Sequence, residues 1–191
     1  MFHSHHPKIT PVLFLLLLGA AASGQTMLHL GGGYGRLAES TGLVRDGGWQ
    51  LGVGHRFQQK YQINLTYFHI GGVQAVETIA GTSSREVTLH DVGLSGEYRL
   101  LQWRGFSLGS ELGAGYLLIH SGAMEIDLGA LGVGNLPAQS DNRPYLGLGF
   151  NLQQAVGNLF TAYIATQWQH FQAGGTNWNY YLKGGIRASL R

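Results

Sequence analysis

Residues 178–190 alternate between two kinds of side chain. The even positions carry Trp178, Tyr180, Leu182, Gly184, Ile186, Ala188 and Leu190, and the odd positions carry Asn179, Tyr181, Lys183, Gly185, Arg187 and Ser189. Successive side chains of a β-strand point to opposite faces, whereas a helix would scatter both sets around its circumference. The segment is therefore predicted to be a strand with one face in an apolar medium and the other in a polar one.

The same period of two recurs along most of the chain. It is clear in residues 49–57, 61–67, 92–98, 106–116, 146–152 and 160–168, and weaker in the glycine-rich residues 28–36. Leu89 and Val92 differ in parity, so we expect a β-bulge around His90 and Asp91. Together with residues 178–190, these segments predict about eight strands.

The predicted connections alternate in length. Residues 58–60, 101–105 and 153–158 are short connections, residues 38–47, 71–84 and 120–142 are long loops, and residues 171–177 are intermediate. Short turns at one end and longer loops at the other are typical of an up-and-down barrel that crosses a bacterial outer membrane. Each strand segment is also close to the roughly 9–11 residues that a tilted membrane strand requires.

Residues 1–24 are predicted to be a cleaved signal peptide. A polar start with Lys8 precedes the apolar run 12–22, and Ser23 and Gly24 follow it. The run is much shorter than the roughly 20 residues of a spanning helix, and it ends in small residues, as exported proteins do at their cleavage site. The mature domain is then expected to cover residues 25–191.

Composition indicates which face of the barrel points outward. Only 12% of the residues are charged, against about 25% in an ordinary soluble domain, and a water-exposed wall would carry far more lysine and glutamate. Aromatic residues, which suit a membrane–water interface, bound the apolar face. They are Trp49, Tyr61, Tyr67, Tyr98, Tyr116, Trp168, Trp178 and Tyr180. We therefore expect an all-β, antiparallel up-and-down transmembrane β-barrel of about eight strands in the bacterial outer membrane.

The opposite face carries few charges among many glycines. They are Arg56, Glu97, Arg99, Glu111, Lys183 and Arg187. Unpaired buried charge is costly, so we expect Glu97 and Glu111 to pair with these cations in a lumen ion network. The alternative is that some of these ions lie in water near the rim without a partner. Eight strands leave room for side chains but not for a wide channel.

The C-terminal pattern Lys183-x-Gly185-x-x-Ala188-x-Leu190 is similar to the sorting signal of outer-membrane barrels, with Leu190 in place of the usual Phe. At the level of layout, the mature chain resembles the small eight-stranded outer-membrane barrels typified by the OmpA membrane domain. Residues 113–122 and 142–147 also resemble the later half of TraO-type proteins from conjugative transposons. That second resemblance implies a part in a DNA-transfer apparatus in the outer membrane.

The chain is expected to be a non-enzymatic structural or interaction component. Cysteine is absent, the histidines form no HExxH motif, and we expect neither a cofactor nor a metal. The formal net charge of +2 gives no reason to expect direct binding of nucleic acid. The expected partners are outer-membrane lipid, the barrel-assembly machinery, and proteins that bind through residues 71–84 and 120–142.

Two alternatives remain open at this point. The first is a lipid-A-modifying enzyme: small lipid-A-deacylating barrels have a His and a nearby Ser about where His170 lies, although Gln172 stands here in place of Ser. His90 and Asp91, with Ser83 and Ser84 in the preceding loop, also have the composition of a Ser/His/Asp set, although a strand-end histidine beside an acid is the plainer interpretation. The second alternative is a secreted ligand-binding barrel, which would be soluble without detergent.

Overall fold

The computed structural model describes residues 24–36, 45–78, 81–127, 129, 132–171 and 178–190. These residues form the strands β1 (Gly24–Arg36), β2 (Arg45–Phe57), β3 (Tyr61–Thr78), β4 (Gly81–Trp103), β5 (Phe106–Ser121), β6 (Met124–Asp127), β7 (Val133–Leu136), β8 (Gln139–Val156), β9 (Phe160–Phe171) and β10 (Trp178–Leu190). The part of the chain that is described contains no helix long and apolar enough to cross a membrane. The predicted signal peptide falls outside the described residues except for Gly24, as do most of the connection 38–47 and residues 172–177.

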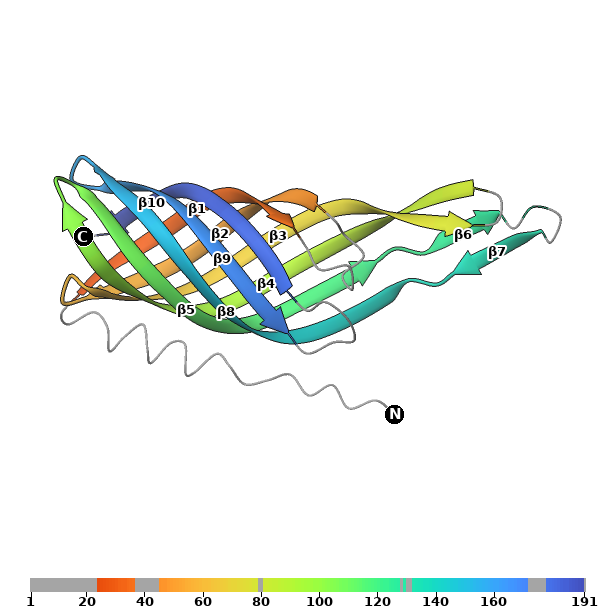
Figure 1. The fold of residues 1–191 in the computed structure, drawn as a ribbon, viewed down its shortest axis with the longest axis horizontal. Helices are drawn as coiled ribbons and strands as arrows, with labels where there is room; N and C mark the ends of the chain where they lie inside the picture. The colour runs from red at the N-terminus through yellow and green to blue at the C-terminus, as the bar shows by residue number, and fades with distance from the viewer. Residues whose placement is uncertain are drawn as a thin grey trace.

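Eight strands close into an antiparallel barrel in the order β1–β10–β9–β8–β5–β4–β3–β2 (Figure 1). Each strand pairs with the next barrel strand along the chain, and β1 pairs with β10 from Thr26–Leu190 to Arg36–Tyr180. The ring therefore leaves no unpaired edge, which is how a sheet satisfies its backbone hydrogen bonds in lipid. The predicted up-and-down β-barrel fold is confirmed.

The wall has the polarity of a membrane barrel. In β10, Leu182 and Ile186 face outward and are exposed, whereas Lys183 and Arg187 face inward and are buried. The other barrel strands repeat this pattern, so leucines, aromatic residues and isoleucines cover the outside, and glycines, amides and ions line the inside. A soluble ligand-binding barrel has the opposite polarity, which excludes that alternative.

The two ends of the barrel differ. At the turn end, tight turns at 58–60, 104–105 and 157–159 connect the strands, and the C-terminus lies beside them (Figure 1). Gln58, Gln59 and Arg104 adopt positive φ angles of 47°, 61° and 43° there. At the opposite end, which we call the hairpin end, β3–β4 and β6–β7 project beyond the ring (Figure 1).

The prediction of long loops is wrong for two segments, because both form β-hairpins. Residues 71–84 continue the β3–β4 ladder from Gly71–Thr88 to Thr78–Gly81. In residues 120–142, β5 runs to Ser121, β6 and β7 pair with each other, and β8 starts at Gln139. Outside the membrane a strand pair needs no apolar face, so the alternation used to find strands fades there while the backbone pairing continues.

The predicted bulge at His90 is also wrong. The β3–β4 register is continuous through this region, and the only shift in the β4–β5 pairing of the described residues lies between Arg99 and Leu101. Val87 and Leu89 point inward with the same parity as Asp91, and both are buried. The apparent slip thus marks a change in the lumen from polar to apolar lining.

Candidate functional site

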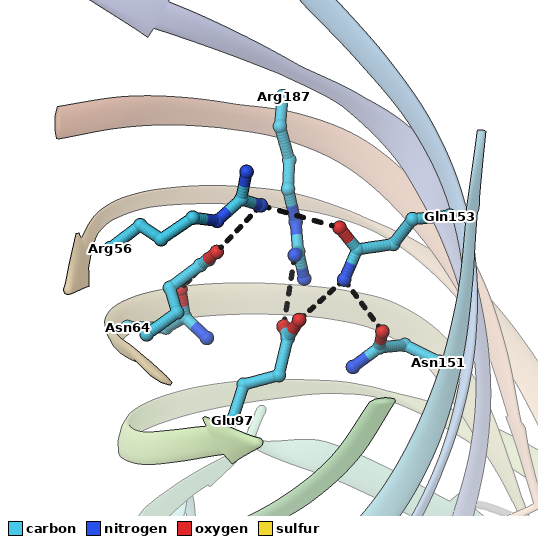
Figure 2. A network of polar contacts seen from close by, with 7 residues as sticks. Arg56, Asn64, Glu97, Asn151, Gln153 and Arg187 are labelled. Carbon is cyan, nitrogen blue, oxygen red and sulfur yellow. Dashed lines mark hydrogen bonds and ion pairs between the residues drawn. The ribbon is translucent and has the colours of Figure 1, made fainter. Parts of the chain in front are cut away.

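A hydrogen-bonded network of inward-facing side chains lies inside the barrel (Figure 2). Arg187 Nη1 donates to Glu97 Oε2 at 2.9 Å, and both side chains of this ion pair are only 4% exposed. Gln153 Nε2 donates to the other carboxylate oxygen of Glu97 and to Asn151 Oδ1, the latter at 2.7 Å. Glu97 is therefore bound through both oxygens, as a buried carboxylate requires.

The network crosses the full width of the barrel. Glu97 on β4 and Arg187 on β10 lie four strands apart around the ring of eight, so they come from opposite walls. Arg56 on β2 lies equally far from Gln153 on β8, and its Nη2 donates to Gln153 Oε1 at 3.5 Å. Side chains from opposite walls therefore meet inside the lumen.

The remaining ions predicted for the lumen occupy different positions. Arg56 also donates to Gln62 Oε1 at 3.2 Å, and Lys183 Nζ donates to Gln167 Oε1 at 2.6 Å. Arg99 is half-buried and donates to Gln102 Oε1 at 3.1 Å near the turn end. Glu111 is half-buried and lines a small internal cavity with Lys183 and Arg187.

This internal cavity has a volume of about 20 Å³, enough for one water molecule. Four of its lining residues have a buried polar atom that finds no hydrogen-bond partner among the described residues. These atoms are His29 Nε2, Gln50 Oε1, Tyr163 OH and Arg187 Nε. Because buried polar groups are almost always satisfied, the cavity has the size and chemistry of a buried water site.

Asp91 is a buried lumen residue that the sequence analysis did not place inside the barrel. It accepts hydrogen bonds from Tyr145 OH and Gln169 Nε2, each at 2.6 Å. Asp91 occupies an odd position of β4, as Ser95 and Glu97 do, and this shared parity could have placed it inside the barrel. His90 faces outward and Asp91 inward, so the Ser/His/Asp arrangement suggested by composition is not assembled.

An apolar cluster closes the lumen at the hairpin end. Its buried members are Phe68, Ile70, Val87, Leu89, Leu117, Ile119, Tyr145, Phe171 and Tyr181. Phe68 packs edge-on against Tyr181 with 5.6 Å between ring centroids, and Lys183 Nζ lies 4.9 Å from the Phe68 ring. The lumen is thus filled by a polar network and by an apolar plug made from the barrel's own wall.

The aromatic residues singled out in the sequence all face outward. Tyr61 and Tyr98 lie near the turn end, with 5.1 Å between their ring centroids. Toward the hairpin end, Trp49 contacts Tyr67 and Trp168 contacts Tyr180 in tilted ring pairs, with 5.3 Å and 5.4 Å between centroids, and Tyr116 and Trp178 are exposed. Aromatic side chains therefore occur near both ends of the apolar wall.

The residues of the C-terminal pattern lie on the strand that closes the ring. Lys183 and Gly185 face the lumen, whereas Ala188 and Leu190 face outward and pair with Leu28 and Thr26 of β1. They are therefore divided between the two faces of β10.

Comparison with known proteins supports the fold. No family model matches the chain, and no curated protein matches it. Among solved structures it is similar to Neisserial surface protein A, with a TM-score of 0.56, 15% identity, and coverage of 86% of this chain and 97% of that one. It is also similar to OprG from Pseudomonas aeruginosa, with a TM-score of 0.55, 11% identity, and coverage of 88% and 97%. For Ail of Yersinia pestis the TM-score is 0.51, with 15% identity and coverage of 86% and 99%.

These likenesses define the class of protein by its fold. The chain has the fold of the small eight-stranded outer-membrane β-barrels, which confirms the predicted resemblance to that class. The apolar outer wall requires a lipid environment, so fold and surface together place the protein in the bacterial outer membrane. The resemblance to TraO-type proteins stays a prediction from the sequence.

Proposed function

We propose that this protein is a non-enzymatic, non-conducting barrel that anchors two hairpins, β3–β4 and β6–β7, at the cell surface for interaction with other molecules. The filled lumen is the observation that carries the proposal. The Glu97–Arg187 pair spans opposite walls, and the apolar plug lies between this pair and the hairpin end. A barrel whose interior is occupied by its own side chains is suited to anchoring rather than transport.

Membrane conductance tests the closed lumen. The mature protein, reconstituted into planar bilayers, is expected to give no steady single-channel current, because side chains from opposite walls meet within the lumen. A reproducible conductance from the folded wild-type protein would contradict the proposal. Heat-dependent migration on a gel distinguishes folded barrels from unfolded ones in the same sample.

Surface display is tested by labelling, since the chain contains no cysteine. Outer-membrane barrels have short periplasmic turns and longer extracellular loops, so the hairpin end is expected to face outward. A cysteine at Thr82 or Asn135 should react with a membrane-impermeant maleimide on intact cells. A cysteine at Gln59, in a turn at the opposite end, is the matched control and should react only after the outer membrane is permeabilised. The reverse pattern would overturn the orientation.

Export and assembly belong to the same proposal. The predicted signal peptide, residues 1–24, would direct export, and Lys183, Gly185, Ala188 and Leu190 would serve as the sorting signal for the barrel-assembly machinery. The N-terminal sequence of the protein purified from outer membranes tests the first point. Reduced assembly of Leu190→Asp, with normal assembly of Ser189→Asp as the control, tests the second.

The absence of enzymatic activity is part of the proposal. His170, the residue considered for lipid-A modification, faces outward and contacts Trp178 in a tilted ring pair with 4.7 Å between centroids. Packing among the outward-facing aromatic residues thus explains the position of the His170 ring without a catalytic role. Mass spectrometry of lipid A from a deletion strain should match the wild type, and an altered acyl or phosphate pattern restored by the wild-type gene would refute this.

The role in conjugation is the most specific form of the proposal and is supported by the sequence resemblance alone. Under it, residues 71–84 and 120–142 would contact other proteins of a transfer apparatus, without direct contact to DNA. Transfer frequency from a donor that lacks the gene is the relevant measurement. Unchanged transfer would remove this role and leave the anchoring function intact.

A further inference from the structure

A large groove lies in the lipid-facing wall, toward the hairpin end. Its volume is about 630 Å³, and it extends from Leu65 on β3 across β4, β5 and β8 to His170 on β9. Ala114, Gly115, Val92 and Leu146 are among the residues that line it. The small residues of β5 create the hollow, because the outward positions on either side of Ala114 carry Leu112 and Tyr116. The size is that of a site for a small ligand.

Histidines and hydroxyl groups lie beside this groove and beyond it toward the hairpin end. Tyr67 OH lies 2.5 Å from His90 Nδ1, and His69 Nδ1 lies 3.5 Å from the same atom. When the Tyr67 hydroxyl donates to Nδ1, the neutral His90 ring carries its proton on Nε2 and has a free donor there. On the neighbouring strands, His120 Nδ1 and Ser140 Oγ are 2.9 Å apart and exposed. We call these five residues the polar arc.

The groove and the polar arc are continuous on one face. His90 is two residues beyond Val92 on β4, which places it about 7 Å farther toward the hairpin end. On β5, His120 lies four residues beyond Tyr116, which lines the groove. An apolar groove that ends in hydrogen-bond donors matches an amphiphile with a long acyl chain and an anionic headgroup.

We propose that this groove binds a phosphorylated lipid of the outer leaflet, with an acyl chain over Ala114 and a phosphate at the polar arc. The leaflet assignment rests on the orientation proposed above, whereas the site itself does not. Three observations favour a lipid over other occupants: the groove faces the membrane, its lining is mostly apolar, and imidazole N–H groups are suited to a phosphate. A neutral imidazole offers one N–H and a protonated imidazole offers two.

Binding of lipid A to the full mature protein in detergent tests the proposal, with native mass spectrometry as the measurement. The probes are diphosphorylated lipid A, its dephosphorylated form, and inorganic phosphate. We expect the diphosphorylated form to bind at least about tenfold more tightly than the dephosphorylated form, which corresponds to about 1.4 kcal/mol. Equal retention of both forms would overturn the role of the polar arc.

Two variants separate the parts of the site. Ala114→Leu fills the groove and should weaken both forms of lipid A. Ala162→Leu makes the same change on the outward face of β9, outside the groove, and should leave binding unchanged. His69→Ala with His90→Ala should weaken only the phosphorylated form, whereas His55→Ala, an outward-facing histidine near the turn end, is the control. Equal effects of variant and control in either pair would refute the proposal.

The other possible occupants give distinct results. If inorganic phosphate protects His90 from chemical modification as well as lipid A does, the site is a free-phosphate site and the lipid proposal is wrong. If Ala114→Leu converts a dimer to a monomer while lipid A binding is unchanged, the groove is an interface between two copies of this chain, which also overturns the proposal. Labelling of Thr82→Cys on cells tests the orientation separately, so a failure of one proposal is distinguishable from a failure of the other.

Discussion

The Glu97 carboxylate and the Arg187 guanidinium form an ion pair inside the barrel, with 2.9 Å between Oε2 and Nη1, although 90 residues separate them in the sequence. The two strands lie opposite each other in the ring, so the pair connects the walls directly. In the same layer, Arg187 also lies over the Tyr163 ring at 4.8 Å. The Glu97–Arg187 pair can form only when the ring of strands closes, and it then occupies the interior of the barrel.

Removing one charge of this pair should destabilise the barrel strongly. Glu97→Gln keeps the size of the side chain but leaves Arg187 buried without its carboxylate, and we expect a loss of about 3–5 kcal/mol in the free energy of unfolding. Urea unfolding in lipid vesicles, followed by tryptophan fluorescence, measures this loss. The double variant Glu97→Gln with Arg187→Met should recover much of it, because the unpaired charge is then removed.

The exposed ion pair of Arg143 and Asp141 provides the control. Its N–O distance is 2.6 Å, but the Asp141 side chain is 51% exposed. Asp141→Asn should cost at most about 1 kcal/mol, since solvent screens the charges. A loss for Glu97→Gln no larger than that for Asp141→Asn would contradict the buried network.

Tyr145 should contribute to stability through its hydroxyl. Tyr145→Phe removes the donor that lies 2.6 Å from Asp91 Oδ1 and leaves a buried carboxylate with one hydrogen bond fewer. The expected loss is about 1–3 kcal/mol in the same unfolding measurement. Tyr116→Phe, on the outward face with the ring 54% exposed, should change stability by less than about 0.5 kcal/mol. Equal effects of the two substitutions would refute the role of the Asp91 hydrogen bond.

Gly115 should tolerate no side chain, whereas Gly96 should tolerate one. A Cβ at Gly115 would overlap the Val92 carbonyl and lie 2.6 Å from the Tyr145 hydroxyl, but the nearest atom to a Cβ at Gly96 is 4.0 Å away. Gly115→Ala should cost about 1–3 kcal/mol through overpacking. Gly96→Ala should be neutral or stabilising by about 0.5–1 kcal/mol, because it lowers the flexibility of the unfolded chain. The yield of folded barrel and the urea midpoint measure both changes.

The depth of the apolar wall can be tested with arginine. Leu94 is 54% exposed on the outside of β4, between Tyr98 and His90, so its surroundings are hydrocarbon. Leu94→Arg should cost about 2–4 kcal/mol, as arginine does near the middle of a bilayer. Leu101, 67% exposed near the turn end, is the control, and Leu101→Arg should cost about 0–1 kcal/mol. Similar costs at both positions would show that the membrane boundary lies elsewhere.

The sequence predicted the barrel well because the two faces of a membrane strand meet different solvents. In β10 the alternation separated Leu182 from Lys183, and the composition of the two faces was enough to put the apolar one outside. For the same reason the predicted bulge was wrong and the apolar cluster inside the barrel was not foreseen. Val87 and Leu89 are apolar residues that face inward, and a rule based on polarity assigns such residues to the lipid side.

The hairpins and the inward direction of Asp91 were also missed, because the polarity of neighbouring side chains did not reveal either one. Beyond the membrane, the pairing of Gly71 with Thr88 follows from backbone hydrogen bonds that leave no trace in side-chain polarity. Asp91 was grouped with His90 at the expected bulge, whereas its parity with Glu97 was the better guide.

The sequence by itself determined the strands, their two faces and the apolar exterior, because alternation is a local property of a β-strand in contact with two solvents. Only the tertiary structure decided which inward residues meet. Closure of the ring brings β4 opposite β10 and β2 opposite β8, and this arrangement joins Glu97 to Arg187 and Arg56 to Gln153. Parity gives the direction of a side chain, but the partner on the far wall depends on strand number and stagger around the whole barrel.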